Sequence, residues 1–355
     1  MKTLEYMTEN GYEQVVYCCD PGAGLKAIIA IHDTTLGPAL GGARFRHYPS
    51  EEAALTDALR LAQAMTYKNA AAGLNLGGGK AVIMADQSRT KSEALFRALG
   101  RFIQSLGGRY ITTEDVGTTV PDMELIRIET RFVTGLPQAG GGSGDPSPVT
   151  AFGVLQAMKA CAKEAFSADS LKGKRVALQG VGKVGYNLAK HLQQEGAVIT
   201  ATDTNKEARE RAKMELGLTL VEPDAIYDTP CDIFSPCALG GVLNDGTIPR
   251  LKCRVVAGGA NNQLAEESHA DALAQRGILY APDFIANAGG VINLALELTG
   301  YNAEVARARI ADIYHTMERV IASARAEGVS TARAANRLAE SRIESVRRMK
   351  RMYLG

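Results

Sequence analysis

Residues 175–185 of the chain read RVALQGVGKVG, an apolar run that leads into a glycine-rich turn. The run predicts a buried strand, and the apolar positions after the turn predict a helix. Gly180, Gly182 and Gly185 have the G-x-G-x-x-G spacing, which allows a tight turn and brings backbone amides close to a pyrophosphate at the positive end of a helix. Strand, turn and helix in this order predict a Rossmann dinucleotide-binding fold.

The next predicted strand, residues 197–202, ends at Asp203, about 20 residues after the first glycine of the turn. A carboxylate at this point can accept hydrogen bonds from the ribose hydroxyls of NAD and would repel the 2′-phosphate of NADP. NAD is therefore the predicted cofactor. Lys206 and Arg209 follow closely in the sequence, and they leave some tolerance of NADP open.

Length and composition bound the remaining possibilities. With 355 residues, 46% of them hydrophobic, the chain is long enough for two cores. Its 40 basic and 39 acidic residues leave a formal charge of +1, so neither nucleic acid nor an anionic membrane is an expected partner. No window offers about 20 apolar residues, and the N-terminus lacks the pattern of a secretory signal. We expect a small-molecule partner.

The cysteines and histidines exclude several kinds of chemistry. The six cysteines form no CxxC pair and have no histidine at zinc-ligand spacing, so we expect reduced thiols, no metal site and a cytoplasmic protein. The five histidines are scattered and form no nucleophile and base signature, which disfavours histidine catalysis.

A glycine-rich segment, residues 138–146, is the predicted domain boundary and hinge. It separates a substrate-binding and oligomerisation domain at residues 1–145 from a Rossmann domain at residues 146–328. Residues 329–355, which are rich in arginine, are expected to return to the first domain as a helix. The predicted fold is a two-domain α/β protein.

Periodicity predicts the secondary structure of both domains. The predicted strands are residues 14–19, 25–32, 81–84, 109–112, 175–179, 197–202, 232–234, 254–257 and 278–280, the first two antiparallel. Helices are expected after N-caps at Ser50, Ser147 and Ser330. Residues 34–44 are predicted to be a glycine-rich loop that can wrap a ligand.

Residues 65–80 read MTYKNAAAGLNLGGGK and place Lys68 and Lys80 among small and apolar residues. Because an ammonium group normally stays in water, this pattern predicts a cleft that holds an anion and tunes an amine. The triple glycine would let the backbone approach a ligand closely. The alternative is a surface turn with two solvated lysines. Asp115 adds a carboxylate near a strand end, where open α/β sheets place their chemistry.

Two later turns, residues 258–262 (GGANN) and 287–293 (NAGGVIN), supply side-chain amides. Asn262 and Asn287 are candidates for contact with a nicotinamide. The alternative is a role as helix caps, which is a common use of asparagine.

With Lys68, Lys80, Asp115 and the glycine fingerprint on one chain, the sequence resembles the dehydrogenases that act on glutamate, leucine, valine and phenylalanine, and most closely the leucine-type members. The resemblance covers nearly the whole length and is most specific at residues 36–44, 65–80, 113–119, 147–151, 235–244 and 281–293. It implies that Lys68 holds the substrate carboxylate with help from the backbone near Gly41. It also implies that Lys80 is the catalytic lysine and Asp115 its partner carboxylate.

The resemblance further implies that Thr150 and Asn262 lie near the nicotinamide and the substrate amine. Oxidative deamination needs an anion site, a base, a hydride acceptor and a group that activates water. We expect Lys68 and partial burial to lower the pKa of Lys80. The predicted cofactor-binding residues are Thr150, Gly180, Gly182, Lys183, Val184, Gly185, Asp203, Asn262 and Asn287.

The pocket residues predict the substrate. Glutamate-specific relatives have a lysine where this chain has Leu40, and an apolar residue here argues against a carboxylate side chain. Phenylalanine-specific relatives tend to have glycine and leucine at the positions of Thr113 and Val291. Leucine-type relatives usually have alanine and valine at the positions of Thr113 and Leu294, so both residues add volume here, and we expect branched aliphatic substrates with a bias toward shorter ones. The predicted substrate-binding residues are Leu40, Gly41, Met65, Lys68, Thr113, Val291 and Leu294.

Alternative functions stay open at this point. They are an aromatic substrate such as phenylalanine and a NAD-binding sensor that has lost its chemistry. A 2-hydroxy acid dehydrogenase is disfavoured because no suitably placed histidine is present. The resemblance also implies a homo-oligomer, with an octamer favoured over a dimer or a tetramer.

Overall fold

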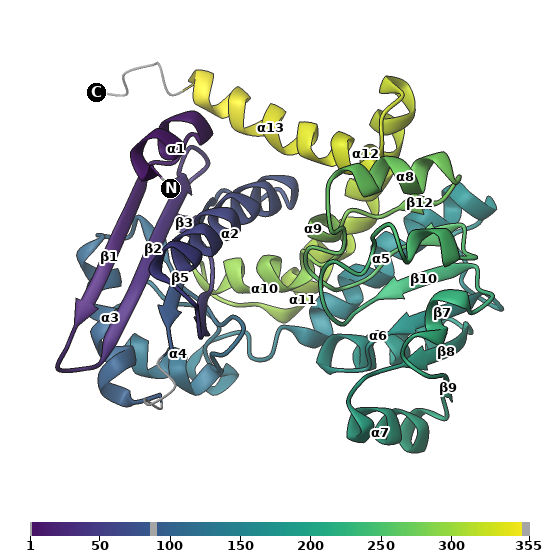
Figure 1. The fold of residues 1–355 in the computed structure, drawn as a ribbon, viewed down its shortest axis with the longest axis horizontal. Coiled ribbons are helices and arrows are strands. Elements are labelled where there is room, and N and C mark those ends of the chain that lie inside the picture. The colour runs from purple at the N-terminus through teal and green to yellow at the C-terminus, as the bar shows by residue number, and fades with distance from the viewer. Residues whose placement is uncertain (1, 86–90, 350–355) are drawn as a thin grey trace. The chain divides into compact units, whose positions relative to one another are not determined.

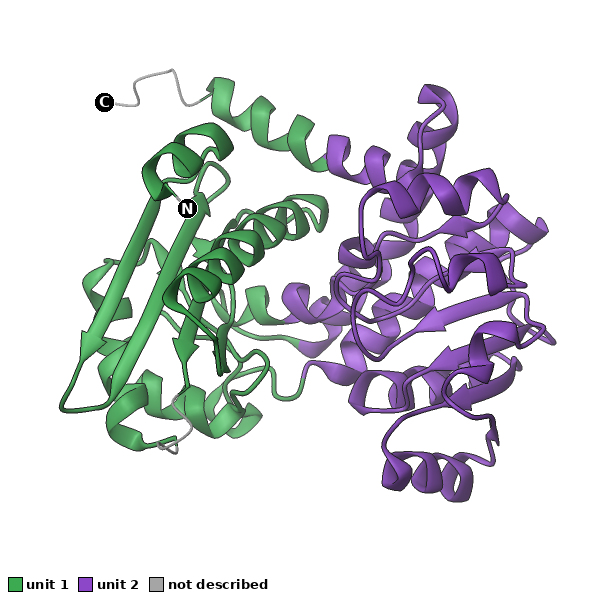
Figure 2. Ribbon diagram, in the orientation of Figure 1, with its two compact units in different colours: residues 1–145, 294–302, 339–355 green, residues 146–293, 303–338 purple. Residues whose placement is uncertain are grey.

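The computed structural model describes residues 2–85 and 91–349 (Figure 1). The chain divides into two compact units (Figure 2). Unit 1 comprises residues 1–145, 294–302 and 339–355, and unit 2 comprises residues 146–293 and 303–338. Helices α10 (Gly289–Glu297) and α13 (Thr331–Met349) contribute residues to both units.

This division differs from the predicted return of residues 329–355 to the first domain. The first turn of α13 belongs to unit 2, where Thr331 Oγ1 donates to Tyr280 O at 2.5 Å. The later part of α13 belongs to unit 1, where Arg342 donates to Leu74 O at 2.6 Å. Residues 294–302 also belong to unit 1, where the Glu297 carboxylate accepts a hydrogen bond from the backbone of Gly135. Residues 350–355 of the predicted segment lie outside the described residues.

Unit 1 contains a mixed sheet in the order β1-β2-β5-β3-β6, with β4 paired to β5. Strand β5 is antiparallel to β2 and parallel to β3 and β4. The elements lying wholly in this unit are α1 (Thr3–Asn10), β1 (Gln14–Asp20), β2 (Leu25–Asp33), β3 (Ala39–Leu40), β4 (Ala43–Arg46), α2 (Glu51–Ala71), β5 (Gly77–Met84), α3 (Glu93–Ser105), β6 (Tyr110–Ile111), α4 (Val120–Arg127) and the 3₁₀ turn η1 (Gln138–Gly140).

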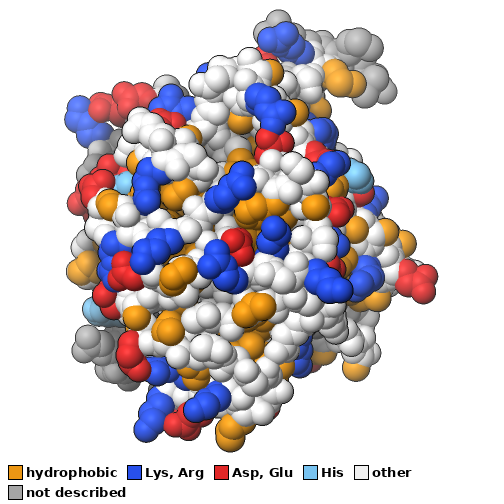
Figure 3. All heavy atoms as spheres, turned by 90° about the vertical axis from the view of Figure 1, so that its right-hand side faces the viewer, with side chains coloured by type: hydrophobic (Ala, Val, Ile, Leu, Met, Phe, Trp, Pro, Cys, Tyr) orange, Lys and Arg blue, Asp and Glu red, His pale blue; other side chains and the backbone are white. Residues whose placement is uncertain are grey.

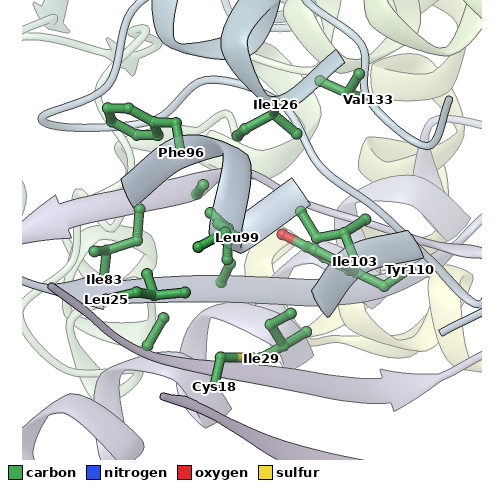
Figure 4. Packing of buried hydrophobic residues seen from close by; sticks show 14 of the residues in the cluster. Cys18, Leu25, Ile29, Ile83, Phe96, Leu99, Ile103, Tyr110, Ile126 and Val133 are labelled. Atoms are coloured by element: carbon green, nitrogen blue, oxygen red, sulfur yellow. The ribbon is translucent and has the colours of Figure 1, made fainter. Parts of the chain in front are cut away.

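Both faces of this sheet are buried, as the alternation of side chains along β2 requires. Ile29 and Ile31 join a cluster formed with α3, in which Phe96 and Leu99 are fully buried (Figure 4). Ile28 and Ala30 point to the other face and pack with α2. The continuous apolar run of β2, read from the sequence as a strand, therefore reflects a sheet covered on two sides.

Helix α2 lies directly against β5 through the triple glycine. A Cβ atom at Gly78 would lie 2.1 Å from Thr66 N, and one at Gly77 would lie 2.0 Å from Asp33 O. The sequence predicts that a ligand makes this close approach. The structure shows that the neighbouring backbone of the same chain occupies the space beside these two glycines.

Two other expectations for unit 1 are wrong in detail. Residues 34–44 are not only a loop, because they contain β3 and the start of β4, whose backbones pair with β5. The strand predicted at 81–84 begins at Gly77, so Lys80 lies inside β5 and not before it. Glycine has low strand propensity, and only the pairing partners on both sides of β5 make these residues a strand.

Unit 2 contains a parallel sheet in the order β12-β11-β10-β7-β8-β9, the arrangement of a Rossmann fold. The predicted N-cap of α5 is wrong, because Ser147 is the first residue of the helix and Pro146 occupies the cap. The elements lying wholly in this unit are α5 (Ser147–Phe166), β7 (Arg175–Gln179), α6 (Lys183–Gln194), β8 (Val198–Thr202), α7 (Lys206–Leu216), β9 (Thr219–Leu220), η2 (Ala225–Asp228), β10 (Ile233–Pro236), η3 (Ile248–Arg250), β11 (Val255–Val256), α8 (Ser268–Gln275), β12 (Leu279–Tyr280), α9 (Asp283–Ala286), α11 (Ala303–Ala311) and α12 (Ile313–Glu327).

The surface agrees with the balanced composition. On the face shown in Figure 3, basic and acidic side chains alternate with small hydrophobic patches. Over residues 2–85 and 91–349, no helix combines the length and the apolar character needed to cross a bilayer.

Replacing Gly78 by alanine tests the packing of α2 on β5. The added Cβ would overlap Thr66 N, so we expect the free energy of unfolding to fall by about 3 kcal/mol. The midpoint of thermal unfolding, followed by circular dichroism, measures this loss. Gly140→Ala is the matched control, because nothing lies within 4 Å of a Cβ there. Equal midpoints for the two variants would contradict the packing described here.

Candidate active site

Lys80 lies inside β5, with a side chain that is only 5% exposed. Its Nζ lies 3.0 Å from Oδ2 of Asp115, which follows β6. Thr118 holds the backbone of Asp115, because Asp115 N donates to Thr118 Oγ1 at 2.8 Å and Thr118 N donates to Asp115 O at 2.9 Å. The two side chains predicted to be catalytic are therefore in direct contact.

Arg44 completes this cluster from β4. Its Nε donates to Asp115 Oδ2 at 2.8 Å, the same oxygen that Lys80 contacts. Its NH1 donates to Asp57 Oδ2 at 3.0 Å, and Tyr48 donates to that oxygen at 2.6 Å. The other oxygen of Asp115, Oδ1, makes no hydrogen bond within the described part of the chain. Arg44 is the last residue of the segment predicted to be a loop, and no role was predicted for it.

The cluster shifts the pKa values of its members. Burial lowers the pKa of Lys80, and Arg44 adds to this effect while Asp115 opposes it. Burial alone would raise the pKa of Asp115, but Lys80 and Arg44 outweigh burial and hold that pKa below its usual value. Burial lowers the pKa of Lys80 as expected. The neighbouring cation that lowers this pKa is Arg44, and the expectation that it is Lys68 is wrong.

The residues predicted to bind the substrate carboxylate lie on α2 and just after β3. Lys68 is half-buried in the last turn of α2. The next residue, Asn69, donates from Nδ2 to Gly77 O at 2.6 Å and so ties this turn to β5. The position of Lys68 along the sheet is therefore set by the amide of its neighbour.

Gly41 and Met65 are neighbours in unit 1. A Cβ at Gly41 would lie 3.3 Å from Met65 Cγ and 1.7 Å from Gly79 O. Leu40, directly before Gly41, is fully buried and pairs with Gly78 and Ile111. These predicted pocket residues surround the middle of β5, which also carries Lys80.

Thr113 and Leu294, far apart in sequence, come together at Gly135. A Cβ at Gly135 would lie 2.8 Å from Thr113 Oγ1 and 3.6 Å from Leu294 Cδ2. Thr113 is 5% exposed, and its hydroxyl has no hydrogen-bond partner among the described residues. Glu297 accepts from Gly135 N at 3.0 Å and from Ser143 N at 2.8 Å. Gly135, which the sequence did not single out, therefore lies between two predicted substrate-binding residues, and Glu297 holds its backbone.

The glycine fingerprint lies between β7 and α6 in unit 2. Gly180 has φ +98°, a conformation that favours glycine, and a Cβ at Gly185 would lie 2.0 Å from Gly180 O. Nothing lies within 4 Å of a Cβ at Gly182, the N-cap of α6. Amides of the first helical turn have no partner inside a helix, so this open end can receive a pyrophosphate. Lys183 is exposed there as the first residue of α6.

Asp203 follows β8 and holds the glycine turn. Its Oδ2 accepts from Val181 N at 2.8 Å, and its Oδ1 accepts from Asn205 N at 2.8 Å. Arg209 is one of the two basic residues that leave binding of NADP open in the sequence. It forms an ion pair with Glu222 at 2.8 Å. Lys206 is 87% exposed. Asp203 is therefore bonded to the turn through Val181 N, and Arg211 donates from NH2 to Val181 O at 3.4 Å on the same residue.

Three of the remaining predicted residues of unit 2, Thr150, Val184 and Asn287, each lie beside a residue of the two later turns. A Cβ at Gly290, beside Val291, would lie 2.7 Å from Thr150 Oγ1, and one at Gly259 would lie 2.7 Å from Val184 Cγ1. Asn287 donates from Nδ2 to Asn261 Oδ1 at 3.0 Å. Its Oδ1 is buried and has no donor among the described residues.

The conformation of Asn262 is unusual for a residue other than glycine, with φ +51°, and its carbonyl accepts from Gly241 N at 2.7 Å. The open N-terminus of α6 at Gly182 and the unpaired Oδ1 of Asn287 both fit a bound dinucleotide, since the first offers donors and the second an acceptor. The predicted site residues thus divide between the units: Leu40, Gly41, Met65, Lys68, Lys80, Thr113, Asp115 and Leu294 in unit 1, and the others in unit 2.

Two models of known protein families match this chain, one in its first part and one in its second. Residues 13–132 match the dimerisation domain of the Glu/Leu/Phe/Val dehydrogenases. Residues 141–210 and 202–351 match the second family model, Glutamate/Leucine/Phenylalanine/Valine dehydrogenase.

Individual relatives extend over the full length. The chain is 60% identical to a leucine dehydrogenase of Bacillus cereus over 100% of this chain and 97% of that protein. It is 50% identical to a phenylalanine dehydrogenase of Bacillus thermotolerans over 99% of this chain and 93% of that protein. Its fold is similar to the crystal structure of L-tryptophan dehydrogenase from Nostoc punctiforme, with a TM-score of 0.85 and 46% identity over 97% and 99% of the two chains.

Asp203→Asn tests how the glycine turn selects its ligand. The amide can still accept from Val181 N but carries no charge, so we expect NADH to bind about tenfold more weakly and NADPH more tightly. Titration of nicotinamide fluorescence measures both affinities. Asp224→Asn, at a carboxylate that is 83% exposed and paired with Arg250, is the control. An unchanged ratio of the two affinities would show that Asp203 does not discriminate between them.

Proposed function

Because the chain belongs to the glutamate, leucine, phenylalanine and valine dehydrogenase family, we propose that it catalyses the reversible, NAD-dependent oxidative deamination of branched-chain aliphatic L-amino acids to 2-oxo acids and ammonia. The observation that carries the proposal is the buried contact between Lys80 and Asp115. It provides an amine of lowered pKa beside a carboxylate, which is the pair that deamination requires.

The chain's own residues have distinct roles in the proposed reaction. Lys68 binds the substrate carboxylate through its ammonium group. Asp115 accepts a proton from the substrate ammonium at Oδ1, because Lys80 and Arg44 already occupy Oδ2. Lys80 then activates the water that attacks the imine carbon, and collapse of that adduct releases ammonia. When bound, NAD would supply the acceptor for the hydride from the substrate Cα.

Three features support NAD as the cofactor. Asp203 places a negative charge beside the glycine turn, and this charge would repel a 2′-phosphate. Arg209 is engaged by Glu222 and is not directed to a phosphate. The open N-terminus of α6 at Gly182 offers unpaired backbone amides.

The pocket supports a branched aliphatic substrate. Leu40 is fully buried and offers no charge to a carboxylate side chain. Thr113 and Leu294 narrow the space beside Gly135 by comparison with alanine and valine, and this favours shorter side chains. The similarity to leucine dehydrogenases supports the same substrate class.

We further propose that the protein is a cytoplasmic homo-oligomer. The family model that matches residues 13–132 is named a dimerisation domain, which supports assembly through unit 1. An octamer is favoured, with a dimer or a tetramer as the other expected states. All six cysteines are free thiols in the structure, which supports a reducing compartment.

A substrate panel tests the proposed function. We expect NADH formation at alkaline pH to be fastest with leucine, valine, isoleucine or 2-aminobutyrate, and slow with phenylalanine, tryptophan and glutamate. Thr113→Ala should raise the ratio of kcat/KM for leucine over valine by about tenfold, since a methylene is worth roughly 1 to 3 kcal/mol in such a pocket. Lys80→Ala is the inactive control. Faster turnover of an aromatic substrate would overturn the pocket assignment. No NADH formation with any substrate would favour the alternative of a NAD-binding sensor that has lost its chemistry.

Arg44→Met tests the electrostatics of the cluster. Arg44 lowers the pKa of both Lys80 and Asp115, so both pKa values rise when the guanidinium is removed. Because the unprotonated forms are the active ones, the acidic limb of the pH profile of kcat/KM should move to higher pH.

Two variants control this experiment. Arg44→Lys keeps a positive charge and should leave the limb closer to its original position. Arg60→Met removes an arginine that is 67% exposed and reaches Asp57 at 3.6 Å, and we expect no shift from it. An acidic limb that stays in place in Arg44→Met would show that this guanidinium does not set the two pKa values.

A further inference from the structure

Unit 2 contains a pocket of about 350 Å³ beside β12, which we call the β12 pocket. It is lined by the C-terminal end of α5, by α8, by residues 277–280 and by the junction of α12 and α13. Arg254, another lining residue, directly precedes β11. The pocket thus lies toward the amino ends of β11 and β12, whereas the glycine fingerprint follows the carboxyl end of β7. In a parallel sheet these ends lie on opposite edges, so the pocket is separate from the dinucleotide site.

The first distinctive feature of the pocket is Ser330. This residue is 7% exposed, and its hydroxyl has no hydrogen-bond partner among the described residues. Ser330 is the predicted N-cap of α13. Its carbonyl does accept from Ala334 N at 3.0 Å, but its hydroxyl makes no capping bond, so that part of the prediction is wrong. An unpaired buried hydroxyl is costly, and a ligand that accepts a hydrogen bond from it removes the cost.

The second feature is an excess of positive charge. Ser330 and Thr331 stand at the N-terminus of α13, a helix of 19 residues with a positive dipole end. Arg254 packs its guanidinium over the ring of Phe166 at 5.0 Å and makes no ion pair with a described residue. The acid in the lining, Glu164, is already paired with Arg325.

The third feature is the apolar wall. Ala270, Ile278, Ile321 and Ala324 line the pocket and are each at least nine-tenths buried. A fully hydrated inorganic ion would leave this wall without a partner. An anion attached to a short hydrocarbon chain satisfies both the polar and the apolar side.

From these three features we infer that the β12 pocket is a binding site for a small organic anion, a carboxylate on a short aliphatic chain. The carboxylate accepts from first-turn amides of α13 and from the Ser330 hydroxyl, which has almost no accessible surface in the free protein and turns toward the pocket on binding, with Arg254 supplying the countercharge. The aliphatic part lies on the wall formed by α8 and α12. This site is independent of the proposed function, because its occupancy does not require turnover.

Binding of 4,4,4-trifluorobutyrate, followed by fluorine NMR, tests this site. The titration uses the full-length Lys68→Ala protein, so that the predicted substrate-carboxylate site does not compete. We expect saturable binding that weakens about tenfold in Ser330→Ala and in Arg254→Gln, because each change removes a contact to a charged group. The neutral amide of the same acid should not bind.

Ser323→Ala and Arg319→Gln are the matched controls. They remove an exposed hydroxyl and an exposed guanidinium from α12 that do not line the pocket, and we expect no loss of affinity. Ser330→Ala should not lower the thermal midpoint, because no hydrogen bond is lost. Absence of saturable binding, equal binding of the amide, or full affinity in both Ser330→Ala and Arg254→Gln would each overturn the assignment.

Discussion

Unit 1 depends on how the ammonium group of Lys80 is accommodated inside a strand. A buried cation is tolerated only when a counter-charge and hydrogen-bond acceptors lie close by, and Asp115 meets this need at 3.0 Å. The strand can carry Lys80 at this depth because the glycines before it let α2 and the backbone of Asp33 approach without side chains between them. The same close packing brings the last turn of α2, with Lys68, to β5 through the amide of Asn69.

The electrostatic balance of the cluster is a competition between burial and charge. Burial disfavours the ionised form of both Lys80 and Asp115, and it dominates for the lysine. For the aspartate, two cations at hydrogen-bond distance outweigh burial and keep it ionised. Arg44 is held by Asp57 on its other side, so this guanidinium is fixed before a substrate arrives. A base of lowered pKa beside an ionised carboxylate is thus built into the fold.

Much of the fold and of the candidate site could be predicted from the sequence, because the sequence patterns that indicate them are local. Gly180, Gly182 and Gly185 need a strand before them and a helix after them, and spacing alone reveals that arrangement. The lysines among small residues and the acid after a strand also stand out. Arg44 could not be recognised, since an arginine in an apolar run reads as a surface residue until β4 is paired with β5. Gly135 and Glu297 were missed for the same reason, as their contacts join distant segments.

The sequence by itself determined the two-domain α/β class, the Rossmann fingerprint and the residue types available for chemistry, because each depends on short-range periodicity or spacing. Only the tertiary structure decided that the triple glycine is a strand packed by its own chain, that Arg44 shares an oxygen of Asp115 with Lys80, and that the hydroxyl of Ser330 has no partner. These features depend on strand pairing and burial between segments far apart in the chain, and such long-range contacts leave no periodic trace in the sequence.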